Sequence, residues 1–379
     1  MSFFGTFESL SNVGIYLDID PMIQLLDPFD VPLQSGVDAN GVSALAESQA
    51  FEIKVEWLEE VGLTPRATLG TATSTDAFIT VLPASATPAS RLRFQSNDII
   101  LVDSEIMLVT GQGSTADTLT VTRAIYGPAA AAHSTGAAVV GLGSYAVEGG
   151  DPTPARAADR ANVFNYLEIF GPYAVTVSET TRAIRKYGIA DEFDHQAMMR
   201  LREGGVAYEQ ALLYGTRNIN TASAAVYARA MGGMISYITT NVNSSTTALT
   251  EPTLLDQMQS CFDVGGNPDR AVMGSKNKRI LSGFTSFGQI QVMRPDGTRG
   301  VKVDTYISDF GQVLVVLDRW CRTADLFIFE RDQAEMTTLR PFQLQPLAKT
   351  GDATKGMVIG EKSLRFFRQK HAARFSALT

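Results

Sequence analysis

Cysteine and histidine are scarce in this chain. Its 379 residues include two cysteines, Cys261 and Cys321, and three histidines. Two distant cysteines form neither a disulfide framework nor a zinc motif, so the sequence indicates a reducing compartment. The N-terminus lacks the basic flank and apolar core of a signal peptide. The longest uncharged stretch, residues 124–147, contains proline and several glycines and is unlike a membrane helix. We therefore expect neither secretion nor a membrane-spanning role.

A surplus of positive charge is also missing. Lys and Arg total 32 against 40 Asp and Glu, which gives a formal net charge of −8. Proteins that hold nucleic acid through its phosphates usually carry a basic surplus, so this balance argues against DNA binding as the main task. The composition is otherwise that of a globular protein, and the length predicts two to three domains at roughly 150 residues each.

Motifs for catalysis or cofactor binding are weak. Asp309-Phe310-Gly311 copies the magnesium-binding triplet of protein kinases, but no other kinase motif accompanies it, and its place between two apolar runs favours a hairpin turn. Residues 356–363 loosely resemble a phosphate-binding loop, yet the glycine spacing is too short, so a strand is favoured. None of His133, His195 and His371 has a partner at metal-ligand spacing.

Acidic residues and thiols also have structural explanations. Asp191, Glu192 and Asp194 stand at the start of a predicted helix, where negative charge complements the helix dipole. Cys261 and Cys321 have apolar neighbours and are expected to be buried. We therefore predict no enzyme, no catalytic residue, no cofactor and no metal site.

The first 50 residues are not predicted to form a compact unit. Pro21, Pro28 and Pro32 break any helix and favour an extended arm. The arm cannot bury its own apolar side chains, which are Phe3, Phe4, Phe7, Ile23, Leu25, Leu26 and Phe29. The sequence leaves open whether they pack on the same subunit or on a neighbouring one.

Residues 66–145 are predicted to form a small all-β unit, because apolar and polar residues alternate there with period two. The expected strands are 78–82, 98–102, 106–110 and 118–122, with turns at 103–104 and 111–114. The stretch 148–154, rich in glycine and proline, is expected to be a linker.

From residue 162 onward the pattern is mixed α and β. The clearest helix is predicted over 190–214, with Phe193, Ala197, Leu201, Tyr208 and Leu212 on one face. Gly204 lies on that face and predicts a close approach of another element or a bend. Further helices are expected at 222–238 and 253–264. Strands are expected at 301–308, 312–317, 325–329, 335–339 and 356–367.

Several segments together resemble a known family. They are Asn165–Phe170 with Ala174–Ser178, Gly188–Glu192 leading to Glu209–Gly215, Ser308–Gly311 with Val313–Val316, and Leu339–Phe342 with Pro346–Asp352 and Glu361–Leu364. Asp27–Leu33 and Glu56–Leu58 add a weaker match. The chain thereby resembles the major capsid proteins of tailed bacteriophages, which have the Hong Kong 97-type fold.

The resemblance implies an α+β fold with four parts. Residues 1–50 correspond to the N-terminal arm, which lies along neighbouring subunits. Residues 51–175 correspond to the extended loop region, here enlarged by the β insertion 66–145. Residues 176–220 and 331–379 correspond to the peripheral domain with its long spine helix, and residues 221–330 to the axial domain.

The function implied by the resemblance is a major capsid protein that assembles into pentamers and hexamers of an icosahedral shell around packaged double-stranded DNA. The implied partners are other copies of the chain, a portal, a separate scaffolding protein and a cement or decoration protein, with no membrane. The implied location is the virion, after assembly in the host cytoplasm. Three alternatives stay open: an encapsulin-type compartment, a phage tail or decoration protein, and an enzyme that uses Asp309.

Overall fold

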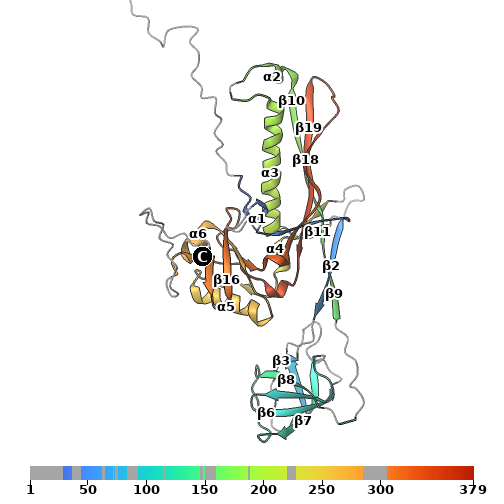
Figure 1. Cartoon of the computed structure of the whole chain (residues 1–379), viewed down its shortest axis with the longest axis vertical. Helices are drawn as coiled ribbons and strands as arrows, with labels where there is room; N and C mark the ends of the chain where they lie inside the picture. The colour runs from blue at the N-terminus through green and yellow to red at the C-terminus, as the bar shows by residue number, and fades with distance from the viewer. Residues whose placement is uncertain are drawn as a thin grey trace, which may run out of the picture. The chain divides into compact units, whose positions relative to one another are not determined.

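The computed structural model describes residues 29–35, 44–61, 65–70, 72, 76–82, 93–113, 117–145, 148–149, 159–186, 188–219, 228–284 and 305–379 (Figure 1). The chain divides into two compact units. The first comprises Met1–Glu56 and Phe164–Thr379, and the second is Trp57–Val163.

One half of the first unit is a four-stranded sheet beside a long helix (Figure 1). The strand order is β1 (Ala46–Gln49), β18 (Ala334–Pro346), β19 (Ala353–Phe366) and β10 (Glu168–Ser178). β1 runs parallel to β18, and the other two pairings are antiparallel. β10 is therefore an edge strand of this sheet.

The long helix α3 (Glu192–Tyr214) confirms the helix predicted over 190–214. Asp191 caps its N-terminus by accepting a hydrogen bond from the backbone N–H of Phe193 at 2.8 Å. The predicted close approach at Gly204 is also present. A Cβ placed on Gly204 would lie 2.9 Å from Cε1 of Phe342, so only glycine lets that aromatic ring pack against the helix backbone.

The other half of the first unit is a six-stranded mixed sheet. Its order is β13 (Val242–Asn243), β20 (Ala373–Phe375), β17 (Leu326–Phe329), β14 (Arg270–Met273), β16 (Gly311–Leu317) and β15 (Thr305–Ser308). Helices α5 (Glu251–Asp263) and α6 (Ser275–Leu281) accompany this sheet, and α5 adds Leu254, Met258 and Cys261 to its core. The predicted helix 253–264 is thus confirmed.

Short elements complete the first unit. They are the helices α1 (Pro32–Ser35), α2 (Glu179–Ala183) and α4 (Met234–Tyr237), the 3-10 turns η3 (Arg331–Gln333) and η4 (Gln369–His371), and the strand pair β11 (Asn218–Ile219) and β12 (Arg229–Ala230). A further strand pair joins β2 (Lys54–Val61) to β9 (Asp159–Tyr166), and most residues of both strands belong to the second unit.

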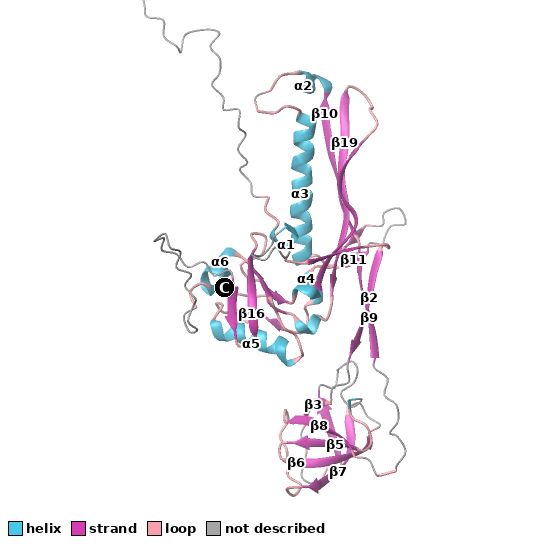
Figure 2. Cartoon of the chain, viewed as in Figure 1, coloured by secondary structure: helices cyan, strands magenta, loops and turns pink. Residues whose placement is uncertain are grey.

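The second unit contains a closed six-stranded barrel (Figure 2). Its strands follow the order β3 (Arg66–Leu69), β4 (Phe78–Leu82), β7 (Thr118–Tyr126), β6 (Glu105–Gln112), β5 (Asp98–Val102) and β8 (Ala138–Ser144). Alternate side chains fill the interior, including Ile79, Ile100, Met107 and Leu119, which are fully buried. The predicted all-β unit is confirmed, but the sequence analysis missed strands β3 and β8 that close it.

The helix predicted over 222–238 is wrong for its described part. Only α4 is helical there; Arg229–Ala230 form strand β12, and residues 231–233 lie in neither a helix nor a strand. Their backbone N–H groups are held by distant acceptors instead: Glu168 binds the N–H of Met231, and Asn165 binds that of Gly232. These bonds compete with the helical pattern that the apolar spacing alone favoured. The first part of the prediction, residues 222–227, lies outside the described residues.

The strand predictions after residue 300 hold with shifted ends. The run 301–308 appears as β15 within its described part, and 335–339 is the start of the longer β18. β20 pairs with β17 and β13, so residues 373–375 belong to the six-stranded sheet. The resemblance had assigned residues 331–379 as a whole to the peripheral domain. The assignment of arm, loop, peripheral and axial parts remains a prediction.

Candidate functional site

Leu33 and Gln34, within the segment that the resemblance assigns to an N-terminal arm, contact helix α3. Leu33 is fully buried, and its backbone N–H donates to Oε1 of Glu209 at 2.6 Å. The side-chain amide of Gln34 donates to the carbonyl oxygen of Gly205 at 2.7 Å and to Oε2 of Glu209 at 2.9 Å. Leu33 and Gln34 thus contact α3 of the same chain, and where the apolar residues named for the arm pack stays open. The other apolar residues named for the arm, from Phe3 to Leu26, lie outside the described residues.

Glu209 is a buried carboxyl group with an unusual acidity. Burial raises the pKa of Glu209 to about 7, although the hydrogen bonds from Leu33 and Gln34 pull it in the opposite direction. Nearby, burial raises the pKa of Asp318 to about 6. Because both pKa values are raised, folding favours the protonated forms of Glu209 and Asp318.

A second attachment holds the same stretch of arm. Arg319 Nε donates to a carboxylate oxygen of Asp30 at 2.7 Å, and the indole N–H of Trp320 donates to the backbone carbonyl oxygen of Asp30 at 2.9 Å. The Arg319–Asp30 pair is largely exposed and contributes little on its own. Together with the Leu33 contacts, these bonds hold residues 30–34 against α3 and against the residues that follow β16.

Large apolar side chains are exposed before and within β2. Phe51 is 88% exposed and Ile53 is 50% exposed in the first unit, and Leu58 is 70% exposed in the second. Exposing such side chains to water costs about 1.5–3 kcal/mol each relative to burial. Such side chains would gain free energy if another protein covered them.

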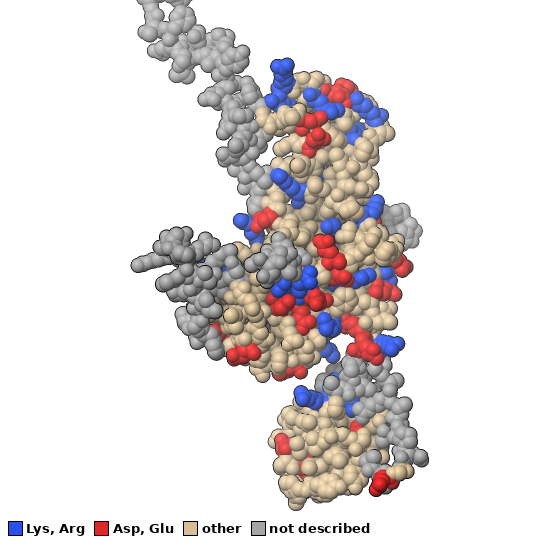
Figure 3. Space-filling model, in the orientation of Figure 1, with Lys and Arg blue, Asp and Glu red and all other residues tan. Residues whose placement is uncertain are grey.

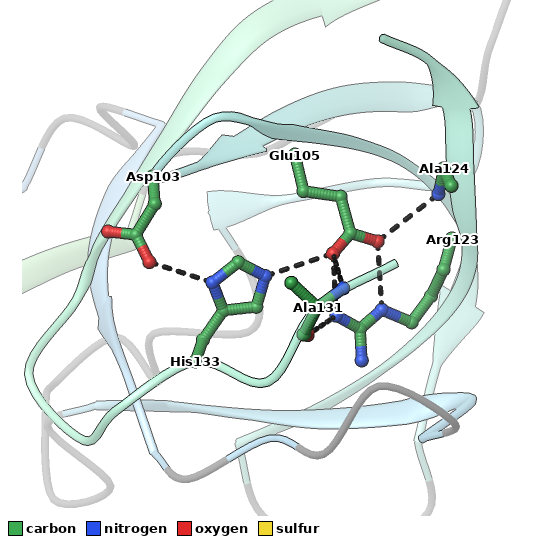
Figure 4. A network of polar contacts seen from close by, with 6 residues as sticks. All are labelled: Asp103, Glu105, Arg123, Ala124, Ala131 and His133. Carbon is green, nitrogen blue, oxygen red and sulfur yellow. Dashed lines mark hydrogen bonds and ion pairs between the residues drawn. The ribbon is translucent and has the colours of Figure 1, made fainter. Parts of the chain in front are cut away.

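The barrel of the second unit contains a buried ion network (Figure 4). Glu105 on β6 and Arg123 on β7 form a two-pronged pair, with Arg123 Nε at 2.9 Å from Oε1 and Nη2 at 2.7 Å from Oε2. His133 lies beside them, with Nε2 at 3.0 Å from Glu105 Oε2 and Nδ1 at 2.7 Å from Asp103 Oδ2. The sequence analysis found no partner for His133, and this constellation was missed because its members lie up to 30 residues apart.

The network fastens the connection between β7 and β8 to the barrel. Glu105 also accepts the backbone N–H groups of Ala124 and Ala131, at 3.2 and 3.0 Å. Burial alone would raise the pKa of Glu105, but the hydrogen bonds from Arg123, Ala131 and His133 lower it to about 2. Both oxygens of the Glu105 carboxylate accept hydrogen bonds that hold the residues after β7 to the barrel, so the network has a structural role.

The other residues singled out in the sequence have structural surroundings. Asp309 is exposed in the tight turn between β15 and β16, where Ser308 pairs with Gly311, as the hairpin prediction states. Residues 356–363 lie within β19, which confirms the strand prediction. Asp191 caps α3, Glu192 pairs with Lys186 at 2.8 Å, and both cysteines are buried and free.

No helix among the described residues has the length and apolar character needed to cross a membrane. No group of three His, Cys, Asp or Glu side chains in the described part of the chain is placed to hold a metal ion.

The described residues thus include a segment, residues 30–34, that is held on the body of the first unit, and several exposed apolar side chains. Residues 3–379 match the family described as SU10 major capsid protein, so the chain belongs to that family and is a component of the virion. The resemblance to phage major capsid proteins is thereby confirmed, and the encapsulin, tail and Asp309-enzyme alternatives are disfavoured. No curated protein matches the sequence.

Three solved structures are similar over nearly the whole chain. The capsid of a native GTA particle is 8% identical, with 97% of each chain covered and a TM-score of 0.49. The capsid of Myoviridae phage XM1 is 9% identical, with 96% of this chain and 99% of that one covered and a TM-score of 0.48. A chain from Microbacterium phage Oxtober96 is 14% identical, with 96% of each chain covered and a TM-score of 0.46.

Proposed function

We propose that this major capsid protein assembles into pentamers and hexamers that close into an icosahedral shell around packaged double-stranded DNA. The observation that carries the proposal is the family match, which spans residues 3–379 and thus includes both units. Contacts between copies that close by rotation generate such rings. The proposed partners are a portal, a separate scaffolding protein and a cement or decoration protein, and the proposed place of assembly is the host cytoplasm.

The surface supports a shell that contains DNA without gripping it. The formal net charge of −8 disfavours tight phosphate binding, so the DNA would be confined and not held. Stability of the shell would come from burial of apolar area between copies, at about 25 cal/mol per Å². Phe51, Ile53 and Leu58 are described side chains that would gain from such burial.

The proposal is tested by expressing the full chain together with the genes that flank its own and imaging the product by electron microscopy. Closed shells of regular size support it, whereas a monodisperse monomer or open aggregates contradict it. Flanking terminase and portal genes fit a DNA-containing shell, whereas a flanking cargo enzyme would favour an encapsulin-type compartment.

A further inference from the structure

The hairpin of β5 and β6 in the barrel carries its acidic residues inside and its aliphatic residues outside. Asp98 and Glu105 point inward and are 6% and 1% exposed. The side chains that alternate with the buried ones point outward and are partly exposed: Ile99, Leu101, Ile106 and Leu108. A sheet with one face on a core normally has polar residues on its other face. Folding of the barrel therefore does not explain these outward aliphatic side chains.

The outward side chains form a continuous apolar row across four strands. Leu101 on β5 stands opposite Ile106 on β6. Val140 on β8 stands on the other side of Leu101, and Tyr126 on β7 stands on the other side of Ile106. A second, shorter row consists of one opposed pair, Ile99 and Leu108. These six residues are called the apolar face below.

The outward side of β4 has no such row. Phe78 is 63% exposed there, but it stands opposite Thr120 of β7. Leu82, farther along β4, stands opposite Thr68 of β3. Apolar and polar residues thus alternate across these strands. A continuous apolar surface is found on the β8–β5–β6–β7 side of the described barrel.

Charge favours an uncharged occupant for the apolar face. None of its six residues carries a charge, and Figure 3 shows few charged side chains on the visible face of the second unit. The whole chain has a formal net charge of −8, so two copies repel each other where their acidic residues meet. A surface without charge is where two copies approach each other with the least repulsion.

A second copy of the apolar face also fits the first by position. Sheets that pack face to face keep their strands within about 30° of each other. With a two-fold axis between β5 and β6, Leu101 of one copy lies over Ile106 of the other. The same axis places Val140 over Tyr126 and Ile99 over Leu108. Each apolar residue then covers an apolar residue of the second copy, so the face is complementary to itself.

The apolar face is too small to hold two free copies together. Strands lie about 4.8 Å apart and alternate residues about 7 Å apart, so its four strands and two rows span about 14 Å by 7 Å. A stable interface needs about 800 Å² on each partner. Copies held in one shell meet at an effective concentration in the millimolar range, where a small contact is sufficient.

We propose that the barrels of two neighbouring subunits pack on each other through their apolar faces, about a two-fold axis, in the assembled shell. This inference rests on the proposed shell function, because assembly supplies the high local concentration. The barrel, which the resemblance treats as an insertion, then connects subunits through the second unit of each chain.

The test uses full-length chains that carry Leu101→Cys and are assembled into particles with the products of the flanking genes. The native cysteines are buried and do not compete for the reagent. A short bismaleimide linker added to purified particles should give a covalent dimer on a denaturing gel. Unassembled chains at the same protein concentration should give far less dimer.

The matched control is Thr80→Cys. Thr80 is partly exposed, as Leu101 is, and it points outward from β4, three strands from β5 in the closed order. Particles of this variant should give no dimer. A second control adds Ile106→Asp to Leu101→Cys, which places a charge over Leu101 of the facing copy and should remove the dimer. The unfolding temperature of the unassembled double variant shows whether it folds, and the comparison with Thr80→Cys does not depend on it.

Each outcome decides the inference. A dimer that forms in Leu101→Cys particles, but not in Thr80→Cys particles or in the folded double variant, supports it. Particles without a dimer overturn it and leave the shell function intact, and protection of the thiol in them shows that another surface covers the apolar face. Equal dimer yields from Thr80→Cys, from the folded double variant or from unassembled chains also overturn it. Failure of wild-type chains to form particles overturns the proposed function and the inference together.

Discussion

Leu33 and Glu209 are joined by a 2.6 Å hydrogen bond across 176 residues of sequence, from the backbone N–H of one to a carboxylate oxygen of the other. Both residues are fully buried. This contact ties residue 33 to helix α3, and it places a carboxyl group with a raised pKa at the junction.

The first prediction concerns pH. Because the pKa of Glu209 is about 7 in the folded protein and 4.5 for an unperturbed glutamate, the folded state binds more protons between these values. The free energy of unfolding should therefore fall by about 3 kcal/mol as pH rises from 4.5 through 7. Glu209→Gln should flatten this dependence, measured by chemical unfolding at pH 5 and pH 8.

A matched control is Glu203→Gln on the same helix, because Glu203 is partly exposed and pairs with Arg200. This variant should keep the wild-type pH dependence. Because the pKa of Asp318 is raised to about 6, the free energy of unfolding of Glu209→Gln should still depend on pH, but less steeply than in the wild type. If the free energy of unfolding of Glu209→Gln varied with pH as it does in the wild type, the Glu209 carboxyl group would not be the source of the pH dependence.

The second prediction concerns the barrel. Glu105→Ala leaves Arg123 buried without its partner, which typically costs about 3–5 kcal/mol. The barrel should therefore unfold at lower denaturant concentration than the wild type, monitored by amide hydrogen exchange within residues 98–126. Asp103→Asn is the matched variant, since Asp103 is 57% exposed and its side chain touches only the outer nitrogen of His133 among the described residues. Equal losses in both variants would contradict the central place given to Glu105.

The third prediction compares two adjacent glycines. A Cβ on Gly205 would meet its nearest atom at 3.9 Å, so Gly205→Ala should stabilise α3 by about 1 kcal/mol through helix propensity. Gly204→Ala should instead destabilise, because its Cβ would lie 2.9 Å from the ring of Phe342. Thermal unfolding of the two variants should shift in opposite directions, and a rise in both would disprove the close approach.

The fourth prediction concerns the exposed apolar side chains. Phe51→Ser should leave the unfolding temperature of the unassembled subunit unchanged, because the side chain is 88% exposed. The yield of closed particles should fall severalfold, since that area can no longer be buried between copies. Sedimentation of assembly reactions measures the yield. Full assembly by Phe51→Ser would show that this side chain lies outside the contacts.

The sequence predicted the elements whose signals are local. Helix α3 carries both an N-cap at Asp191 and a regular apolar face, and the turns at Asp103 and Gly311 carry their own backbone preferences. Strands β3 and β8 were missed because their alternation is weak, and they become strands by closing the barrel. Residues 231–233 were misassigned because Asn165, far away in sequence, supplies the competing hydrogen bond.

The surfaces were harder to predict than the fold. The long-range pairs Leu33–Glu209 and Glu105–His133 join residues whose proximity depends on the completed fold, so no local pattern marks them. The arm was recognised as a segment unable to bury its own side chains, yet its anchor was not. Burial of Leu33 also shows that a deletion meant to test the arm should end at residue 28, since removing residues 1–35 would take a core side chain with it.

The proposed shell depends above all on the arm, which would hold neighbouring copies together. Electron microscopy tests this dependence by comparing particles formed by the full chain with those of a variant lacking residues 1–28, each co-expressed with the flanking genes. We expect closed shells from the full chain, and a folded variant, verified by its unfolding temperature, that forms no stable shells. Regular, stable shells from the variant would contradict the role of the arm.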